Sequence, residues 1–334
     1  MMHKPRHLLI LPRLRIQNAN AISAPLTWGF PAMTALTGFM QALERRLPDE
    51  LYLQLEQIGV VSHGHEIQSS PVGYNEQQFH LTRNPINNRK YLEKDGGTKV
   101  PAIVEEGRMH MDISLMLAVG GGDGTGDDLA GQNLQKNAEE LTQIARDIDV
   151  IVHGMRIAGG SVMPRADIER RPRLVSLPDD SEDYDREFQK IRRQLLPGFA
   201  LVLNEQALAE RLAACRHTDP DTSPLDAWLD FARLHHDCLI DEEDGTHAWQ
   251  IRRRSGWQVP IPVGYKSLSA HEPGTVANAR DPHIPFHFVE SIYSIGQWVS
   301  PHRLPRPESL LWYVDNDLDN GIYRLNNDYI RHNH

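Results

Sequence analysis

The chain has 334 residues and a formal net charge of −10 at pH 7, from 35 Lys and Arg against 45 Asp and Glu. This acidic balance excludes a free, non-specific nucleic-acid-binding protein, because such proteins carry an overall basic field. Two cysteines, Cys215 and Cys238, are too few for a disulfide framework. No window approaches the roughly 18 consecutive apolar residues of a membrane span. We therefore expect one elaborated cytoplasmic domain over residues 1–334, without membrane contact.

Charged residues are segregated along the chain into basic and acidic segments. The basic segments are 4–15, 165–173 and 252–254, and the acidic ones are 123–128, 179–185 and 241–244. The first basic segment holds four cations and no acid. An acidic protein with one such basic segment is typical of a subunit that holds a defined RNA inside an assembly.

The first half of the chain predicts the order strand, helix, strand, strand, helix, strand. The first strand covers residues 7–16, and the first helix carries apolar residues at helical spacing, namely Met33, Leu36, Phe39, Met40, Leu43 and Leu47. Apolar patterning then predicts strands at 51–61, 77–83 and 103–119, a helix at 128–148 and an extended segment at 150–157.

This order predicts an α+β fold with an RRM-like, or ferredoxin-like, antiparallel sheet over residues 1–163. Its helices would cover one face and leave the other face free for RNA. The polar segment 84–98 is typical of the projecting loop of a hairpin. Residues 164–334 then form a C-terminal elaboration.

The C-terminal elaboration predicts short helices and strands. We expect helices at 186–196, 205–215 and 224–236, and strands at 199–203, 248–252, 257–261 and 310–314. The acidic segment 177–187 predicts a surface loop, and the proline-rich tract 260–307 predicts a mostly ordered loop.

Several stretches resemble one known family, and they occur in the family's order. They are His7–Asn20 (HLLILPRLRIQNAN), Phe79–Pro85 (FHLTRNP), Ala102–Met111 (AIVEEGRMHM), Met155–Ser161 (MRIAGGS), Arg193–Val202 (RQLLPGFALV), Trp257–Tyr265 (WQVPIPVGY), Asn278–Asp281 (NARD), Ser300–Arg303 (SPHR) and Leu310–Tyr313 (LLWY). Over nearly its whole length the chain resembles the Cas-five-type subunits of type I-F CRISPR surveillance complexes, which are the second member of the Csy complex.

The resemblance implies an RRM-like core with a thumb-like hairpin and a non-catalytic role. It implies that the chain holds the 5′ handle of the CRISPR RNA at the tail of the complex, where it pairs with the large Cas-eight-type subunit. The other implied partners are the Cas-seven-type backbone subunit and target DNA near the tail, and the chain is a candidate target of viral anti-CRISPR proteins. RNA processing would belong to a different subunit, and no cofactor is implied.

The first strand supplies the main candidate site. Arg13, Arg15 and Gln17 alternate along it and should share one face, and Asn18 and Asn20 follow in the adjoining loop. Guanidinium groups suit phosphates, and amides can read base edges or the 2′-hydroxyl of RNA. In the alternative interpretation the arginines form surface salt bridges and the asparagines cap turns.

Further candidate contacts lie elsewhere in the chain. Trp28 could stack on a base, although a Trp followed by Gly-Phe-Pro is also typical of a core anchor. Thr82, Arg83 and Asn84 at the root of the projecting loop could contact RNA or form a hairpin-root network. Arg156 precedes Gly159-Gly160, whose backbone could approach a phosphate or form a bulge. Arg280 could contact RNA or pair with Asp281.

Other motifs predict no further site. The segment Gly120–Gly126 (GGGDGTG) lacks the GK[ST] of a P-loop and is interpreted as a connection. The histidine clusters match no metal-binding spacing, so we expect no metal. Two alternatives to RNA holding remain. One is a metal-independent endoribonuclease that processes CRISPR repeat RNA, and the other is a structural bridge with incidental RNA contacts.

Overall fold

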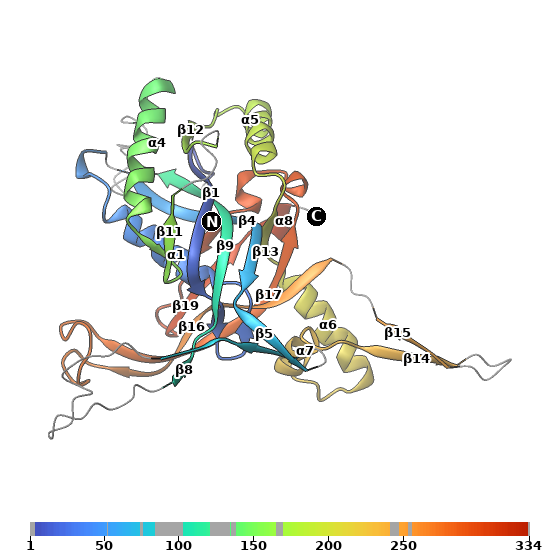
Figure 1. Cartoon of the computed structure of the whole chain (residues 1–334). Coiled ribbons are helices and arrows are strands. Elements are labelled where there is room, and N and C mark those ends of the chain that lie inside the picture. Colours follow the sequence, from blue (N-terminus) through green and yellow to red (C-terminus); the bar gives the residue numbers. More distant parts are fainter. Residues whose placement is uncertain are drawn as a thin grey trace.

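A large antiparallel sheet of eleven strands organises the computed structural model of the chain (Figure 1). The structure describes residues 4–51, 53–73, 76–83, 103–120, 134, 138–164, 170–240, 247–252 and 256–332. Within these ranges the chain also forms six α-helices. The α+β class predicted from the sequence is therefore confirmed.

Four strands of the N-terminal half lie side by side in the order β11-β1-β9-β4, each antiparallel to its neighbour. They are β1 (His7–Asn20), β4 (Gln54–Ile67), β9 (Arg108–Gly120) and β11 (Gly160–Met163). Helix α1 (Met33–Glu44) follows β1, and helix α4 (Ala138–His153) follows β9. The predicted order of strands and helices is present, although α4 ends at His153 where an extended segment was expected. The short strand β10 (Arg156–Ile157) then leads into β11.

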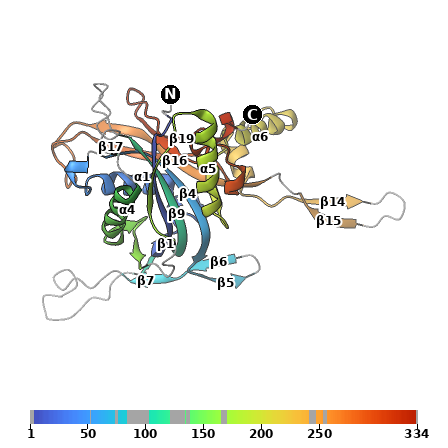
Figure 2. The same cartoon turned by 90° about the horizontal axis from the view of Figure 1, so that it is seen from above.

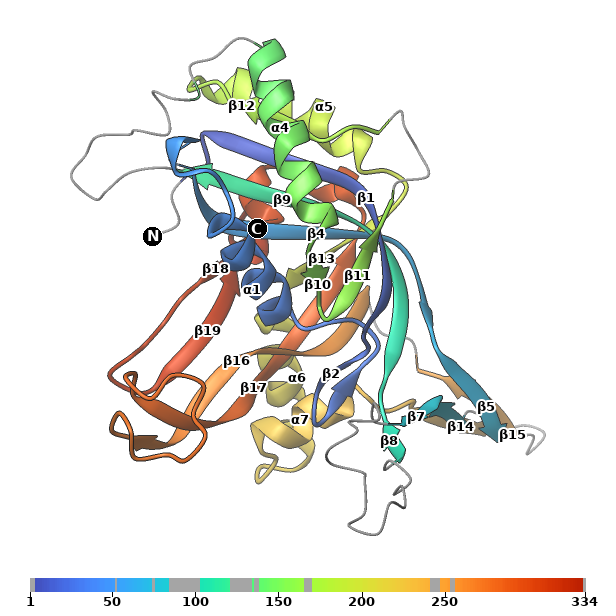
Figure 3. The ribbon, with the colours of Figure 1, turned by 60° about the vertical axis from the view of Figure 1, so that its left-hand side comes forward.

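Different helices cover the two faces of this sheet. Successive side chains of a strand point to opposite faces, so Leu9 of β1 packs with α1 and α4, which lie in front of the sheet in Figure 3. Leu8 and Ile10 instead pack with α5 (Ser181–Gln194). Ile10 is the last residue of β1 that packs in the apolar cluster around α5. Beyond that point the second face carries the groove described below.

Strand β4 also belongs to a closed ring of six strands. The ring runs β4-β13-β17-β16-β19-β18 and returns to β4 where Trp312 pairs with Ile58. Its other members are β13 (Phe199–Leu203), β16 (Trp257–His271), β17 (Phe286–Val299), β18 (Trp312–Val314) and β19 (Ile322–Asn327). The Trp312 side chain is fully buried, and its Nε1–H donates to the carbonyl oxygen of Leu201 at 2.8 Å.

The prediction of a loop over residues 260–307 is wrong, because β16 and β17 form a long hairpin there. Proline removes a backbone donor and is confined to positions whose N–H is not needed by a ladder. Pro260 and Pro262 pair with β17 on one side, and β16 pairs with β19 only at residues 264–266. The other edge of β16 therefore has no ladder at either proline.

The prediction of a surface loop over residues 177–187 is also wrong, because α5 begins at Ser181. The Asp180 side chain caps this helix by accepting hydrogen bonds from the backbone N–H groups of Glu182 and Asp183. Acidic side chains in the first turn also interact favourably with the positive, N-terminal end of the helix dipole. The acids that suggested a loop are thus signals for a helix start.

The remaining elements complete the sheet and surround it. They are β2 (Ile22–Ala24), β3 (Thr27–Trp28), η1 (Asp49–Leu51), β12 (Arg173–Ser176), α6 (Glu205–Thr218), α7 (Pro224–Asp230), η2 (Pro301–Arg303), η3 (Pro307–Ser309) and α8 (Tyr329–His332). Helix α7 ends six residues before the predicted boundary at residue 236, because the chain turns into another strand there. No helix within the described ranges is long and apolar enough to cross a bilayer.

Besides the short β2–β3 pair, three two-stranded arms within the described residues lie outside the large sheet (Figure 2). They pair β5 (Ser69–Gly73) with β6 (Glu76–Phe79), β7 (Leu81–Arg83) with β8 (Ile103–Glu105), and β14 (His236–Ile240) with β15 (His247–Ile251). The predicted strand 77–83 is therefore interrupted at His80. The projecting loop 84–98 lies outside the described residues.

We predict that Trp312→Ala lowers the free energy of unfolding by about 3–5 kcal/mol, because it empties a fully buried site at the closure of the ring. Urea unfolding measures the change. The matched control is Trp249→Ala in β15, where the side chain is 69% exposed, and its cost should stay within about 0.5 kcal/mol. Equal costs for the two variants would contradict the closed ring.

Candidate nucleic-acid interface

Strand β1 contains two bulges that shape its exposed end. Its register with β9 shifts between Leu11 and Leu14 and again between Ile16 and Ala19. Arg13 and Asn18 lie at these shifts with φ of 53° and 58°. A non-glycine residue in this left-handed region costs about 1–2 kcal/mol, so other contacts must hold it there.

The structure brings Arg13, Arg15 and Gln17 to one groove, and the predicted common face is confirmed. This arginine groove has a volume of about 740 Å³. Its other polar side chains are His65, Glu66, His110 and Asp112. Two guanidinium groups thus share the groove with two carboxylates, which makes its local charge mixed.

The two arginines differ in their partners. The Arg13 Nη2 lies 2.6 Å from Asp112 Oδ2, in a salt bridge whose side chains are about 30% exposed. The salt-bridge interpretation of Arg13 is therefore correct. The Arg15 side chain is exposed, and among the described residues it has no ion-pair or hydrogen-bond partner. Arg15 is the guanidinium in this groove that is available to a phosphate.

A chain of hydrogen bonds holds the bulge at Arg13. The Arg13 backbone N–H donates to Ser114 Oγ at 3.0 Å, and Ser114 Oγ lies 2.7 Å from His63 Nε2. His63 Nδ1 lies 2.6 Å from the carbonyl oxygen of Pro197. A neutral His63 that donates from Nδ1 and accepts at Nε2 satisfies every bond in this chain. Burial, the largest cause, lowers the pKa of His63 and favours that neutral form.

Asn18 is held by a network at the second bulge. Its side-chain oxygen accepts from Gln68 Nε2 at 2.8 Å, its carbonyl oxygen accepts from Arg108 Nη1 at 3.2 Å, and its N–H donates to His110 Nδ1 at 3.3 Å. The Asn20 side chain accepts from the N–H of Ile22 and donates to its carbonyl oxygen. The turn-capping interpretation therefore describes Asn20 and not Asn18, whose side chain bonds to Gln68 from a distant part of the chain.

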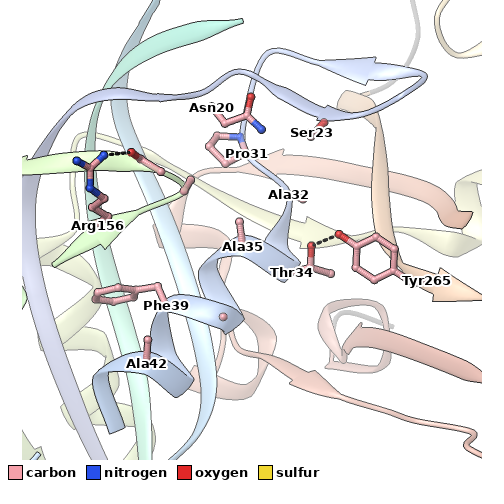
Figure 4. Close-up of a pocket in the computed structure, with 13 residues that line it drawn as sticks. Asn20, Ser23, Pro31, Ala32, Thr34, Ala35, Phe39, Ala42, Arg156 and Tyr265 are labelled. Atoms are coloured by element: carbon pink, nitrogen blue, oxygen red, sulfur yellow. Dashed lines mark hydrogen bonds between the residues drawn. The ribbon is translucent and has the colours of Figure 1, made fainter. Parts of the chain in front are cut away.

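Asn20 and Arg156 meet at a second hollow, which we call the amide pocket (Figure 4). Its volume is about 510 Å³. Arg156 Nη1 donates to the Gly159 carbonyl oxygen at 3.1 Å, and Thr34 Oγ1 lies 3.4 Å from the Tyr265 hydroxyl on another wall. The lining contains no carboxylate. Arg156 therefore gives this pocket a positive charge that the arginine groove lacks.

The two glycines after Arg156 have different roles. A Cβ on Gly160 would lie 2.7 Å from the Ala19 backbone nitrogen, so glycine allows β11 to approach β1. Gly159 has φ of 78°, and a Cβ there would meet nothing within 4 Å. Of these two glycines, Gly159 is the one that leaves open backbone beside the pocket.

The remaining candidates are dispersed. Trp28 is 57% exposed and contacts Phe79 edge-on at 5.6 Å, so its interpretation as a core anchor is wrong. Thr82 and Arg83 lie in β7, at the root of an arm, and Asn84 lies outside the described residues. Arg280 is exposed in the connection between β16 and β17 and lines neither hollow.

Sequence reasoning missed the residues that hold the site together. Asp112, Ser114 and His63 come from β9 and β4, and neither their spacing nor their type signals contact with Arg13. The described residues contain no group of three potential metal ligands. Residues 121–126 of the glycine-rich segment lie outside the described ranges.

We predict that His63 makes the stability of the fold depend on pH. Because its folded pKa lies below the ordinary value of 6.5, its contribution is complete above pH 6.5 and is lost as pH falls through the folded pKa. His63→Gln should cost about 1–3 kcal/mol at pH 8, by disrupting the bonds to Ser114 and Pro197. It should also reduce the loss of stability between pH 8 and pH 5.5, measured by urea unfolding.

The control is His217→Gln, which changes an exposed histidine of α6. It should leave both the stability and its pH dependence as in the unmodified protein. An unchanged pH dependence in His63→Gln would show that His63 is not the group responsible.

Comparison with known proteins places the chain in a family. It matches the model of the CRISPR-associated protein family Cas_Csy2 over residues 9–325. It is 44% identical over 331 residues to the CRISPR-associated protein Csy2 of Pseudomonas aeruginosa (strain UCBPP-PA14), with 96% of this chain and 95% of that protein covered. Both matches span nearly the whole chain and confirm the resemblance found in the sequence. The chain therefore belongs to the Csy2 family of CRISPR-associated proteins.

Proposed function

We propose that this chain holds the 5′ handle of the CRISPR RNA at the tail of a type I-F Csy complex, in the cytoplasm. One observation carries the proposal. Within an acidic chain, β1 carries Arg15 and Gln17 into one groove and Asn20 into another that also holds Arg156. Cations beside amides and open backbone suit a strand whose phosphates are fixed and whose bases are splayed.

We infer further that residues 1–163 form an RRM-like core. The order β11-β1-β9-β4 supports this inference, because it places the last strand beside the first and the third beside the second. The arm of β7 and β8 is the candidate root of a thumb-like hairpin. Residues 164–334 then elaborate this core, since β13, β16, β17, β18 and β19 extend from it through β4.

The proposed partners are the other subunits of the complex. They are the large Cas-eight-type subunit and the Cas-seven-type backbone subunit, and target DNA passes nearby. The arm of β14 and β15 is a candidate subunit contact, because Leu239, Trp249 and Ile251 are all at least half exposed on it. Surfaces of this kind would also be open to viral anti-CRISPR proteins.

The second candidate function is a metal-independent endoribonuclease. The observation that favours it is the presence of His65 and Glu66 in the arginine groove, since burial lowers the pKa of His65 and keeps a general base neutral. Neither the family nor the relative is named for an enzymatic activity. We therefore propose a non-catalytic role, without a cofactor or metal. A third possibility is a structural bridge whose RNA contacts are incidental.

We predict that Arg15→Ala/Arg156→Ala lowers the affinity of this chain, paired with its large-subunit partner, for labelled CRISPR RNA by at least about 100-fold. The physical reason is the loss of two phosphate contacts. The slope of log K against log salt should also fall in magnitude by about 1.4, as expected for two phosphates of a single strand. Filter binding at several salt concentrations measures both quantities.

The control is Arg186→Ala/Lys190→Ala, which removes the same charge from α5, where both cations are about 60% exposed. It should leave the salt slope close to that of the unmodified protein. Equal losses in the two double variants would sink the proposed site and favour the structural bridge. Shortened RNA in the unmodified sample would favour the nuclease.

A further inference from the structure

A third recess lies between the β2–β3 turn and the hairpin of β16 and β17. Its volume is about 170 Å³, and we call it the tryptophan recess. Aromatic rings from both sides line it, namely Trp28, Phe30, Trp257 and Trp298. No charged side chain lines the recess except His65 when protonated, and Ser23 is its other polar side chain. It is therefore an aromatic slot without a fixed charge.

The rings are held in a fixed arrangement. Phe30 contacts Trp298 edge-on at 5.0 Å, and Trp257 lies 6.0 Å from Trp298 and 5.4 Å from Phe199. Trp28 remains 57% exposed and Trp257 50% exposed at this recess. Large rings supported from behind and open in front form a ready stacking surface.

The recess adjoins both hollows of the candidate interface. It shares His65 with the arginine groove, and it shares Ser23, Pro31 and Ala32 with the amide pocket. The unpaired Arg15 lies in the first neighbour and Arg156 in the second. The sequence of surfaces is thus cation, uncharged aromatic slot, cation.

We propose that the tryptophan recess takes one unstacked base of the bound RNA strand, while flanking phosphates contact Arg15 and Arg156. The proposal rests on the function proposed above and assigns it a base-binding subsite. An uncharged aromatic slot suits a base and not a phosphate, and the cations on both sides suit the backbone that carries the base. A buried side chain from a protein partner would leave these cations unexplained.

The recess offers little hydrogen-bonding specificity. Ser23 Oγ lies 2.8 Å from Thr27 Oγ1, which leaves His65 as the main group facing a base edge. Burial lowers the pKa of His65, so its ring is neutral and has one donor and one acceptor. Stacking should therefore dominate, and exchange of one base for another should matter less than its removal.

A double-mutant cycle on the pair of this chain with its large-subunit partner tests the proposal. Abasic sites are placed one at a time along the 5′ handle, and affinity is measured for the unmodified protein, Trp257→Ala and Trp28→Ala. At one handle position the abasic site should weaken binding by about 5- to 150-fold, which corresponds to the loss of one stacked base. The same abasic site should cost little more in either tryptophan variant. Phe288→Ala is the matched control, because it removes a 52% exposed aromatic ring of β17 that lines none of the three hollows, and it should leave the full abasic effect.

The outcomes separate this proposal from the function on which it rests. If RNA binds tightly but every abasic effect is additive with both tryptophan changes, the base-binding recess is wrong and RNA holding stands. If the tryptophan changes release the large subunit without altering any abasic effect, the recess is a protein contact and the proposal fails. If the unmodified pair binds no RNA, the proposed function itself fails. Two independent tryptophan variants keep the test decisive if one of them does not fold.

Discussion

Strand β4 is the constraint on which the rest of the structure depends, because it belongs to two structural units at once. One edge pairs with β9 along nearly its whole length, and the other edge pairs with β13 and β18. A Cβ on Gly59 would lie 2.5 Å from Cγ of the buried Leu310, so the strand accepts only a glycine where this packing is closest. The glycine lets Leu310, two residues before β18, pack directly on β4.

This shared strand also positions the candidate interface. The last part of β4 supplies His63, which supports the bulge at Arg13, and His65, which borders two hollows. The bulge is strained, and it is held by the chain of hydrogen bonds that runs through Ser114 of β9 and His63 of β4 to Pro197. Strain held by surrounding contacts is typical of positions where geometry serves a function. The site is therefore a product of the sheet and not of the β1 segment alone.

The distribution of charge is what allows us to propose an RNA-binding surface on an acidic protein. Arg13 is neutralised by Asp112, whereas Arg15 has no partner among the described residues and the lining of the amide pocket has no carboxylate. A small number of unpaired cations at defined positions favours one path for a bound nucleic-acid strand. A general basic field would instead attract any nucleic acid. The aromatic recess between them adds a surface that the net charge does not affect.

The spacing of apolar and polar residues in the sequence by itself determined which face of each segment is buried in the core. This spacing predicted β13 at its observed bounds and the buried apolar face of α1. It also predicted the common face of Arg13, Arg15 and Gln17. These features follow from the sequence because the direction in which successive side chains point depends only on the local helix or strand geometry. Only the tertiary structure decided the partners of those residues. The pairing of Arg13 with Asp112 and the meeting of Asn20 with Arg156 depend on strand register over about a hundred residues or more. The loop predicted over residues 260–307 was wrong for the same reason. Only the tertiary structure shows that Pro260 and Pro262 face an edge of β16 without a second ladder, where their missing N–H donors are not needed.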